Sequence, residues 1–231
     1  KNISLLLVLG VTGVSIFNSV VYYALNFTQV INAVLMISII PVIIIFLSST
    51  LKIEKFNLFQ LLGLIISLIG VLVIISKADL NKILSLIFNK GDLWMLVAVF
   101  SWATYSTLLK KRKLPFKGLT LLQILITIGL FFLLPQYLGE HISGKEVTFN
   151  KAFFLILAFV AIFPSIFAFY AWNKSIELIG ANRSSIFLHL MPLFGAIMAV
   201  VVFKEKFEMY HFLGAGFIVT GIYLSNRKEN D

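Results

Sequence analysis

The stretch KIEKFNLFQLLG, residues 52–63, recurs in outline as FKEKFEMYHFLG, residues 203–214. A single ungapped offset of 151 residues aligns the two stretches. The identical pairs in this register are Glu54 and Glu205, Lys55 and Lys206, Phe56 and Phe207, Leu62 and Leu213, and Gly63 and Gly214. The same offset aligns Pro41 with Pro192 and Gly70 with Gly221. Because the chain has only 5 prolines and 14 glycines, chance does not explain this register, and we infer an internal repeat.

The composition of the chain excludes a water-soluble fold. Hydrophobic residues make up 60% of the 231 residues and charged residues 13%, against roughly 45–50% and about 25% in soluble proteins. The mean hydropathy of +1.01 points the same way, because a globule of this size cannot hide so much apolar surface from water. Soluble enzymes and nucleic-acid binders are therefore excluded, and with 0 cysteines so are disulfide scaffolds.

Eight apolar runs approach the ~20 residues that a helix needs to cross the hydrocarbon core. They cover residues 4–26, 29–50, 57–76, 91–110, 119–138, 152–173, 180–203 and 208–225. Lipid forbids open strands and irregular backbone, so the predicted fold class is an all-α integral membrane protein. The link 77–90 carries apolar residues at helical spacing, which favours a short interfacial helix over an ordinary polar loop. These residues are Leu80, Ile83, Leu84, Ile87 and Phe88.

We expect the two copies of the repeat to have opposite orientations in the membrane. Each copy is a block of three helices, 4–76 and 152–225, and their first helices are five spans apart. Five is odd, so the blocks are inverted, as in many secondary transporters.

The symmetry also predicts helices beyond this chain. Two helices precede the second block, beginning near Gly91, and their counterparts would start before Lys1. We therefore expect ten helices in all, five plus five, of which eight are present; a natural eight-helix protein is the alternative. The expected units are residues 1–76 (the last three helices of the first repeat), 77–90 (a linker), 91–226 (the second repeat) and 227–231 (a tail).

The positive charges predict how the chain is oriented. The net charge of +9 comes from short basic clusters between the apolar runs. Of the 19 Lys and Arg residues, twelve fall on the side that holds the C-terminus and seven on the other. Because cytoplasmic loops carry the excess of these residues, we expect a cytoplasmic C-terminus in a bacterial cell membrane. The first 28 residues are too long an apolar run for a signal peptide and lack a cleavage site, so we interpret them as a span.

Further motifs accompany the repeat. The segment YAWNKSIELIGANRSS, residues 170–185, precedes LMPL at 190–193, and YALNFT at 23–28 precedes IPV at 40–42. This order, spacing and duplication resemble the drug/metabolite transporter superfamily, specifically its EamA-type branch, over essentially the whole chain. The resemblance implies two inverted five-helix repeats around a central cavity, and solute movement by alternating access without ATP hydrolysis. It implies no particular substrate, and the first two helices of the family pattern are missing.

Polar and aromatic residues inside the apolar spans are candidates for the wall of a substrate cavity, because each needs a partner or a wet surface. Hydrogen bonding between helices is the alternative role for any one of them. The candidates are Asn18, Tyr22 and Asn26 on one face of the first helix, Phe169 and Asn173 at equivalent places in the second block, and Ser101, Trp102 and Tyr105 in the span that begins near residue 91.

His189 is a separate candidate. It lies well inside its span, one turn after Ser185 and three residues before Pro192, and its counterpart in the first copy is Ser38. As the only titratable mid-span residue besides tyrosine, it could bind substrate or change protonation during transport. The alternative is a neutral histidine bonded to a neighbouring helix. Pro192 and its equivalent Pro41 each remove a backbone donor and predict a kink, either a flexing point or a static packing feature.

Two pairs of glycines indicate helix packing. Gly63 and Gly70, like Gly214 and Gly221, are seven residues apart and therefore lie on one helix face. Small residues in this arrangement allow two membrane helices to approach closely. We assign them to packing rather than to solute contact.

The acidic residues and motifs favour a transporter over an enzyme. All 10 acidic residues lie in loops or at span ends, which favours uniport or exchange over a proton relay unless His189 or the missing helices supply the coupling. Metalloprotease, P-loop and GxSxG motifs are absent, so no catalytic residue, metal site or cofactor is predicted. We expect a secondary transporter for a small metabolite, amino acid-like or another small organic solute, with this solute and the lipid bilayer as partners and no nucleic acid. An integral-membrane enzyme acting on a lipid-linked substrate is the alternative, and a channel or structural subunit is a third. The oligomeric state is open, a homodimer included.

Overall fold

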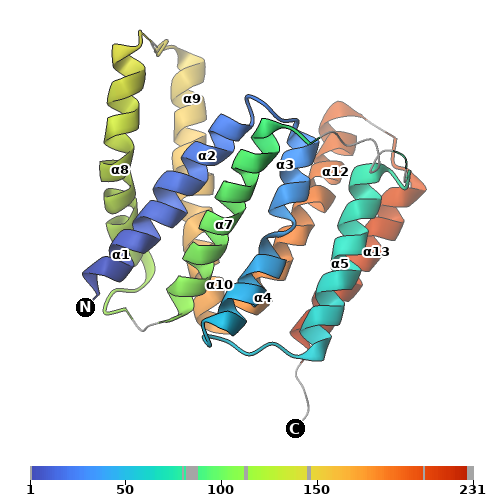
Figure 1. Cartoon of the computed structure of the whole chain (residues 1–231). Coiled ribbons are helices and arrows are strands. Elements are labelled where there is room, and N and C mark those ends of the chain that lie inside the picture. The colour runs from blue at the N-terminus through green and yellow to red at the C-terminus, as the bar shows by residue number, and fades with distance from the viewer. Residues whose placement is uncertain are drawn as a thin grey trace.

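The computed structural model describes residues 2–79, 81, 88–111, 114–144, 147–204 and 206–227. Within these residues every regular element is a helix (Figure 1). The α-helices are α1 (Ile3–Leu9), α2 (Phe17–Ala24), α3 (Val30–Ile37), α4 (Ile40–Thr50), α5 (Leu58–Ser76), α7 (Lys90–Lys111), α8 (Gly118–Ile142), α9 (Lys151–Val160), α10 (Phe169–Ile179), α11 (Ala181–Ser185), α12 (Leu190–Phe203) and α13 (Met209–Asn226). Two π-helical segments, η1 (Gly10–Ile16) and η2 (Ala161–Ala168), and one 3-10 segment, η3 (Ile186–His189), join some of them.

Seven continuous helical stretches in the described part of the chain are long and apolar enough to cross a membrane. They are Ile3–Ala24, Val30–Thr50, Leu58–Ser76, Lys90–Lys111, Gly118–Ile142, Lys151–Ile179 and Ala181–Phe203. The protein is therefore an all-α, multi-pass membrane protein. The eighth predicted span also forms a helix, α13, but polar residues such as His211 and Asn226 lower its hydropathy and it is not among the seven.

Two helices extend beyond their predicted spans because polar residues continue them. The span predicted at 152–173 runs on to Ile179, and the span predicted at 119–138 runs on to Ile142. The first of these ends where Gly180 takes φ +89°. A side chain rarely adopts this left-handed backbone, so glycine terminates the helix here.

The predicted link 77–90 is described only near its ends. Leu80, Ile83, Leu84 and Ile87 lie outside the described residues, so the interfacial helix stays a prediction. At the far end α7 already begins at Lys90, one residue before the predicted span.

Helix boundaries in the two blocks correspond at the offset of 151 residues that aligns their sequences. η1 and η2 begin at Gly10 and Ala161, α3 and α11 at Val30 and Ala181, and α5 and α13 at Leu58 and Met209. Both α5 and α13 also start with a capping box. In this motif the side chain of the residue just before the helix bonds the backbone N–H of the third helical residue, whose side chain bonds back to the backbone N–H of the residue before the helix. The sequence repeat is thus also a repeat of local structure.

Each block contains one broken helix just before its proline. α3 ends at Ile37 and α4 begins at Ile40, so the break precedes Pro41. In the second block the 3-10 segment η3 occupies the turn before Pro192. A proline lacks the N–H that would bond the carbonyl four residues earlier, and this missing bond accounts for the irregular turn in both places.

Helices α5 and α13 cross at contacts between glycines. A Cβ atom built on Gly63 would collide with the carbonyl oxygen of Gly221, and one on Gly221 would collide with that of Gly63. Gly70 and Gly214 show the same reciprocal contact. Exchanging each glycine for its repeat equivalent turns one contact into the other, so the crossing is self-complementary in the way of a two-fold interface.

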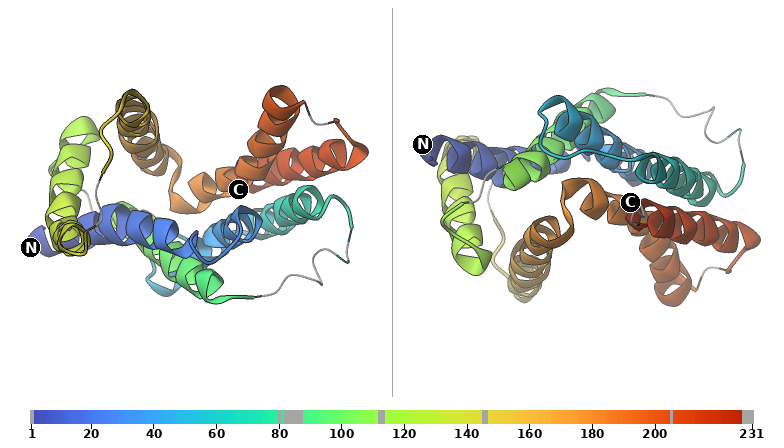
Figure 2. Two further views of the ribbon diagram at one scale, coloured as in Figure 1. Left: turned by 90° about the horizontal axis from the view of Figure 1, so that it is seen from above. Right: turned by 90° about the horizontal axis from the view of Figure 1, so that it is seen from below.

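The helices are arranged in two rows. Figure 2 shows α1–α2, α7, α3–α4 and α5 in one row, with the helices of residues 150–226 to one side of it. The main apolar core surrounds α7, whose Met95, Val99 and Ala103 are fully buried. α7 therefore connects the first block to the helices that carry the larger cavity.

Candidate functional site

Of the two cavities at the ends of α7, the larger lies at its C-terminal end and has a volume of about 390 Å³. It is enclosed by the C-terminal ends of α7 and α10 and by the turn into α8, where Gly118 takes φ +56°. Its lining residues are Leu109, Lys110, Leu114, Phe116, Lys117, Gly118, Leu121, Tyr170, Asn173, Lys174, Ile176 and Glu177. This volume falls within the range of roughly 300–1,000 Å³ that is common for small-molecule sites.

Asn173 lines this cavity and is held in place by Tyr105. The Tyr105 hydroxyl lies 2.5 Å from Asn173 Oδ1. Such a short distance is typical of O–H···O bonds and shorter than usual for N–H···O bonds, so the tyrosine donates and the amide oxygen accepts. The other amide atom, Asn173 Nδ2, is buried and has no partner among the described residues.

An aromatic cluster lies next to this pair and joins the first block to the second. The Trp102 ring is 4.5 Å from Phe17, 5.3 Å from Tyr105, 5.2 Å from Phe169 and 5.6 Å from Trp172, measured between centroids. The Trp172 Nε1 atom donates to Ser106 Oγ at 3.1 Å. A side chain on Gly13, in η1, would collide with the Tyr105 ring, so the π-helical segment has a glycine where the cluster touches it.

The rim of the cavity carries four charged residues. Lys110 Nζ donates to the carbonyl oxygens of Ile176 and Glu177, at 3.3 and 3.4 Å, at the C-terminal end of α10. A cation at this end of a helix is favourable, because the helix dipole places partial negative charge on the last carbonyls. Lys174 pairs with Glu177 at 3.0 Å. Lys117 is exposed on the turn that precedes α8.

His189 lies in a second buried cluster, between the two proline breaks. Its Nε2 atom is 2.9 Å from the Ser38 carbonyl oxygen and its Nδ1 atom 2.6 Å from Ser67 Oγ. A carbonyl only accepts, so Nε2 carries the proton and Nδ1 accepts from the Ser67 hydroxyl. Ser38 lies at the break between α3 and α4, where Val42 N bonds the Ile39 carbonyl instead of that of Ser38. His189 is thus a neutral, fully bonded histidine in this conformation.

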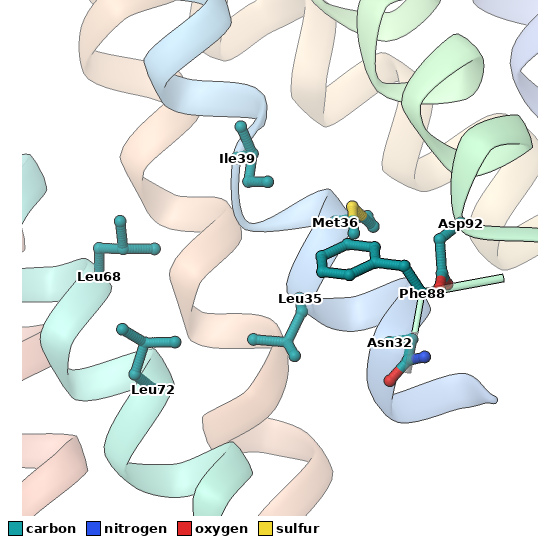
Figure 3. Close-up of a pocket in the computed structure, with 8 residues that line it drawn as sticks. All are labelled: Asn32, Leu35, Met36, Ile39, Leu68, Leu72, Phe88 and Asp92. Atoms are coloured by element: carbon teal, nitrogen blue, oxygen red, sulfur yellow. The ribbon is translucent and has the colours of Figure 1, made fainter. Parts of the chain in front are cut away.

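The smaller cavity, about 230 Å³, lies at the other end of α7. Figure 3 shows Asn32 and Asp92 near Phe88 at one end, and Leu68 and Leu72 of α5 at the other. Asp92 lies in the first turn of its helix, as predicted for an acidic residue at a span end, but it is only 2% exposed. Both its oxygens accept bonds, from Thr28 Oγ1 at 2.5 Å and from the Asn89 backbone N–H at 2.9 Å.

The other predicted cavity residues do not line either of these two cavities. Asn18 and Asn26 donate to carbonyls of their own helix, Val14 and Tyr22, and the Tyr22 ring is exposed. Two of the predicted serines are also bonded to backbone carbonyls: Ser101 Oγ donates to Thr12 and Ser185 Oγ to Asn182. The structure therefore brings together Trp102, Tyr105, Phe169 and Asn173, separately joins Ser38 to His189, and leaves the first-helix stripe apart.

Glu54 has a role that the sequence did not reveal. Its carboxylate accepts from the backbone N–H groups of Ala181 and Asn182, at 3.1 and 2.9 Å, and so caps α11. A Cβ atom on Gly180 would collide with this carboxylate. In the sequence, Glu54 stands out only because it recurs as Glu205, and this recurrence indicates the repeat without indicating a capping role. No group of three or more acidic or histidine residues in the described ranges could hold a metal ion.

Comparisons with known proteins agree with the sequence resemblance. Residues 1–76 and 89–227 match the EamA-like transporter family. An "Uncharacterized transporter" from Archaeoglobus fulgidus is 31% identical over 224 residues, 96% of this chain and 76% of the relative. The "Uncharacterized transporter YyaM" of Bacillus subtilis is 26% identical, over 96% of this chain and 72% of its own length.

A yeast relative and a solved structure extend the comparison. The "Thiamine-repressible mitochondrial transport protein THI74" of Saccharomyces cerevisiae is 29% identical over 219 residues, 89% of this chain and 58% of the relative. One protein of known crystal structure, 17% identical, has a TM-score of 0.74 and aligns over 97% of this chain and 78% of its own. This last likeness concerns the fold alone. The names of the relatives point to membrane transport rather than to catalysis.

Proposed function

The chain belongs to the EamA-like transporter family, and on this premise we propose that it is a secondary transporter of a small metabolite that works by alternating access. The proposed architecture is a pair of inverted repeats, five helices plus five, of which eight helices lie in this chain. The proposed location is the bacterial cytoplasmic membrane, with the C-terminus in the cytoplasm.

The contact between His189 and Ser38 is the observation that carries the proposal. These two residues are 151 apart, so each is the repeat equivalent of the other. A residue can touch its own equivalent only near the axis that relates the two copies. The reciprocal glycine contacts of α5 and α13 meet the same condition. Both observations support an axis between the blocks, about which they can rock.

The aromatic cluster is the proposed gate at one end of the transport path. Phe17 comes from the first block, whereas Trp102, Tyr105, Phe169 and Trp172 come from the helices of the second repeat. The 390 Å³ cavity ends at the Tyr105–Asn173 pair. In this proposal the cavity is a vestibule, and separating Phe17 from the other rings opens it toward the membrane midplane.

Counterflow in proteoliposomes tests the transport proposal. Vesicles that contain the purified protein are loaded with one candidate solute and diluted into the same labelled solute, across a panel of amino acids, sugars and nucleosides. A carrier gives saturable uptake that overshoots when unlabelled solute is inside. Linear, non-saturable flux would contradict alternating access and indicate a channel.

Single cysteines test the orientation. The chain has 0 cysteines, so Lys117→Cys and Phe88→Cys each provide one reactive thiol, at opposite ends of α7. A membrane-impermeant maleimide should label residue 117 only from the cytoplasmic side and residue 88 only from the outside. The opposite pattern contradicts a cytoplasmic C-terminus.

A further inference from the structure

The larger cavity combines an excess of positive charge at its rim with an unpaired hydrogen-bond donor in its wall. Three lysines and one glutamate line it, a formal balance of +2 from 3 − 1. We propose that this cavity binds a small organic anion, a carboxylate or a phosphate ester, as the solute that the protein carries. This inference rests on the proposed transport function and names its substrate class.

The free amide N–H₂ of Asn173 indicates what the ligand must offer. The short bond from Tyr105 fixes which amide atom is the oxygen, and so fixes Nδ2 as the atom that remains free. A buried donor without a partner is costly. A ligand that displaces the atoms covering Nδ2 and places an acceptor oxygen there removes that cost, whereas an ammonium group offers only further donors.

The charges at the rim select against a cation. The Lys110 ammonium is occupied by two helix carbonyls and the Lys174 ammonium by Glu177. Lys117 has no hydrogen-bonded or ion-paired partner among the described residues, and it faces the same cavity. A bound anion can therefore contact the ammonium group of Lys117, which is free, and that of Lys174, which it would share with Glu177. These contacts weaken with added salt, because they lie near solvent.

The rest of the wall accepts the uncharged part of such a solute. Leu114, Leu121, Phe116 and Tyr170 present apolar and aromatic surface to the cavity. Ligand sites commonly combine such a wall with a few placed polar groups. The cavity thus suits a compact anion with an apolar or aromatic body rather than a sugar.

Four probes that share a phenyl ring test the charge preference, and benzoate, benzamide and benzamidine also have nearly the same shape. Benzoate and phenyl phosphate are anions, benzamide is neutral and benzamidine is a cation. Binding of each labelled probe to the detergent-purified 231-residue protein is measured by equilibrium dialysis at millimolar concentrations. We expect saturable binding of at least one anion and at least tenfold weaker binding of benzamidine. Equal or tighter binding of benzamide or benzamidine, or no saturable binding of either anion, overturns the inference.

Variants then locate the site. Lys117→Gln with Lys174→Gln should weaken anion binding by about tenfold, since each exposed charge contributes modestly. Asn173→Leu should weaken it by about tenfold or more, the loss of one hydrogen bond to a charged acceptor. Lys55→Gln is the matched control, an exposed lysine outside the cavity, and should bind as the unmodified protein does. Unchanged anion binding in both cavity variants overturns the assignment.

Two further measurements distinguish the anion site from a lipid-headgroup site and from the transport proposal. Phosphatidylglycerol added to the micelles should not displace phenyl phosphate; displacement would assign the cavity to a lipid headgroup instead of a solute. Binding needs no transport, so the two proposals fail separately. Anion binding without counterflow contradicts the carrier proposal alone, and counterflow of a cationic solute contradicts the anion site alone.

Discussion

Replacing His189 by alanine is the sharpest test of how the two blocks are joined. The side chain is completely buried and bonds the Ser38 carbonyl at 2.9 Å and Ser67 Oγ at 2.6 Å. Alanine leaves the carbonyl, already released by the helix break, without a partner. The expected cost is about 1–3 kcal/mol for that orphaned group and about 2 kcal/mol for the cavity left by the ring.

The total of roughly 3–5 kcal/mol is measurable as a thermal shift. At about 2–4 °C per kcal/mol for a chain of this size, the apparent melting temperature in detergent should fall by about 10 °C. Ser67→Ala leaves the buried His189 Nδ1 atom without its donor and should cost about 1–3 kcal/mol, less than His189→Ala because it leaves no cavity of the size of the ring. His189→Gln keeps a donor and should recover about half of the loss.

Two results would refute this reasoning. If His189→Ala melts within about 2 °C of the unmodified protein, the contact to Ser38 does not hold the blocks together. If Ser67→Ala costs as much as His189→Ala, the histidine acts through Ser67 and not through the helix break. Tryptophan fluorescence follows both transitions, since 3 tryptophans report on the fold.

Four other substitutions have expected outcomes in the same thermal assay. Gly63→Ala should lower the free energy of unfolding by about 1–3 kcal/mol, because the added Cβ atom meets the facing backbone of α13. Gly216→Ala is the control: a Cβ atom there has nothing within 4 Å, so the free energy of unfolding should stay the same or rise by up to about 1 kcal/mol. Equal effects of the two substitutions would contradict the tight crossing. Gly180→Ala should cost about 2–4 kcal/mol, since it combines a left-handed backbone with a clash against the carboxylate that caps α11, and an unchanged melting temperature would show that this cap does not form. Tyr105→Phe should cost about 1–3 kcal/mol, because the amide oxygen of Asn173 loses its hydrogen-bond donor. A shift of the melting temperature below about 1 °C would contradict this prediction.

The positions of the helices could be predicted from the sequence because lipid imposes a simple length and polarity rule. Seven of the predicted apolar runs fall on helices long and apolar enough to span. The rule failed at helix ends, where polar residues such as Lys174 and Glu177 continue a helix that the apolar run no longer marks. The extended end of α10 contributes Lys174, Ile176 and Glu177 to the lining of the larger cavity, so the apolar run stopped short of residues that belong to the candidate site.

The candidate site could be predicted only in part because a polar side chain in a helix has two ways to be satisfied. Tyr105 and Asn173 bond each other between helices, as a site requires. Asn18 and Asn26 bond carbonyls of their own helix, and no periodicity distinguishes this outcome from the first. The role of Glu54 depends on a helix that starts 127 residues later, and spacing along the chain does not reveal such a contact.

The crossing of α5 and α13 has a genetic consequence. Each glycine there is in contact with the backbone of the other helix, so neither position can gain a side chain unless its counterpart helix shifts. Second-site suppressors of Gly63→Ala should therefore map to α13, around Gly221 and Ser225, rather than to the neighbours of residue 63 in α5. The two copies of the repeat, offset by 151 residues, are therefore expected to vary together where Gly63 faces Gly221 and Gly70 faces Gly214.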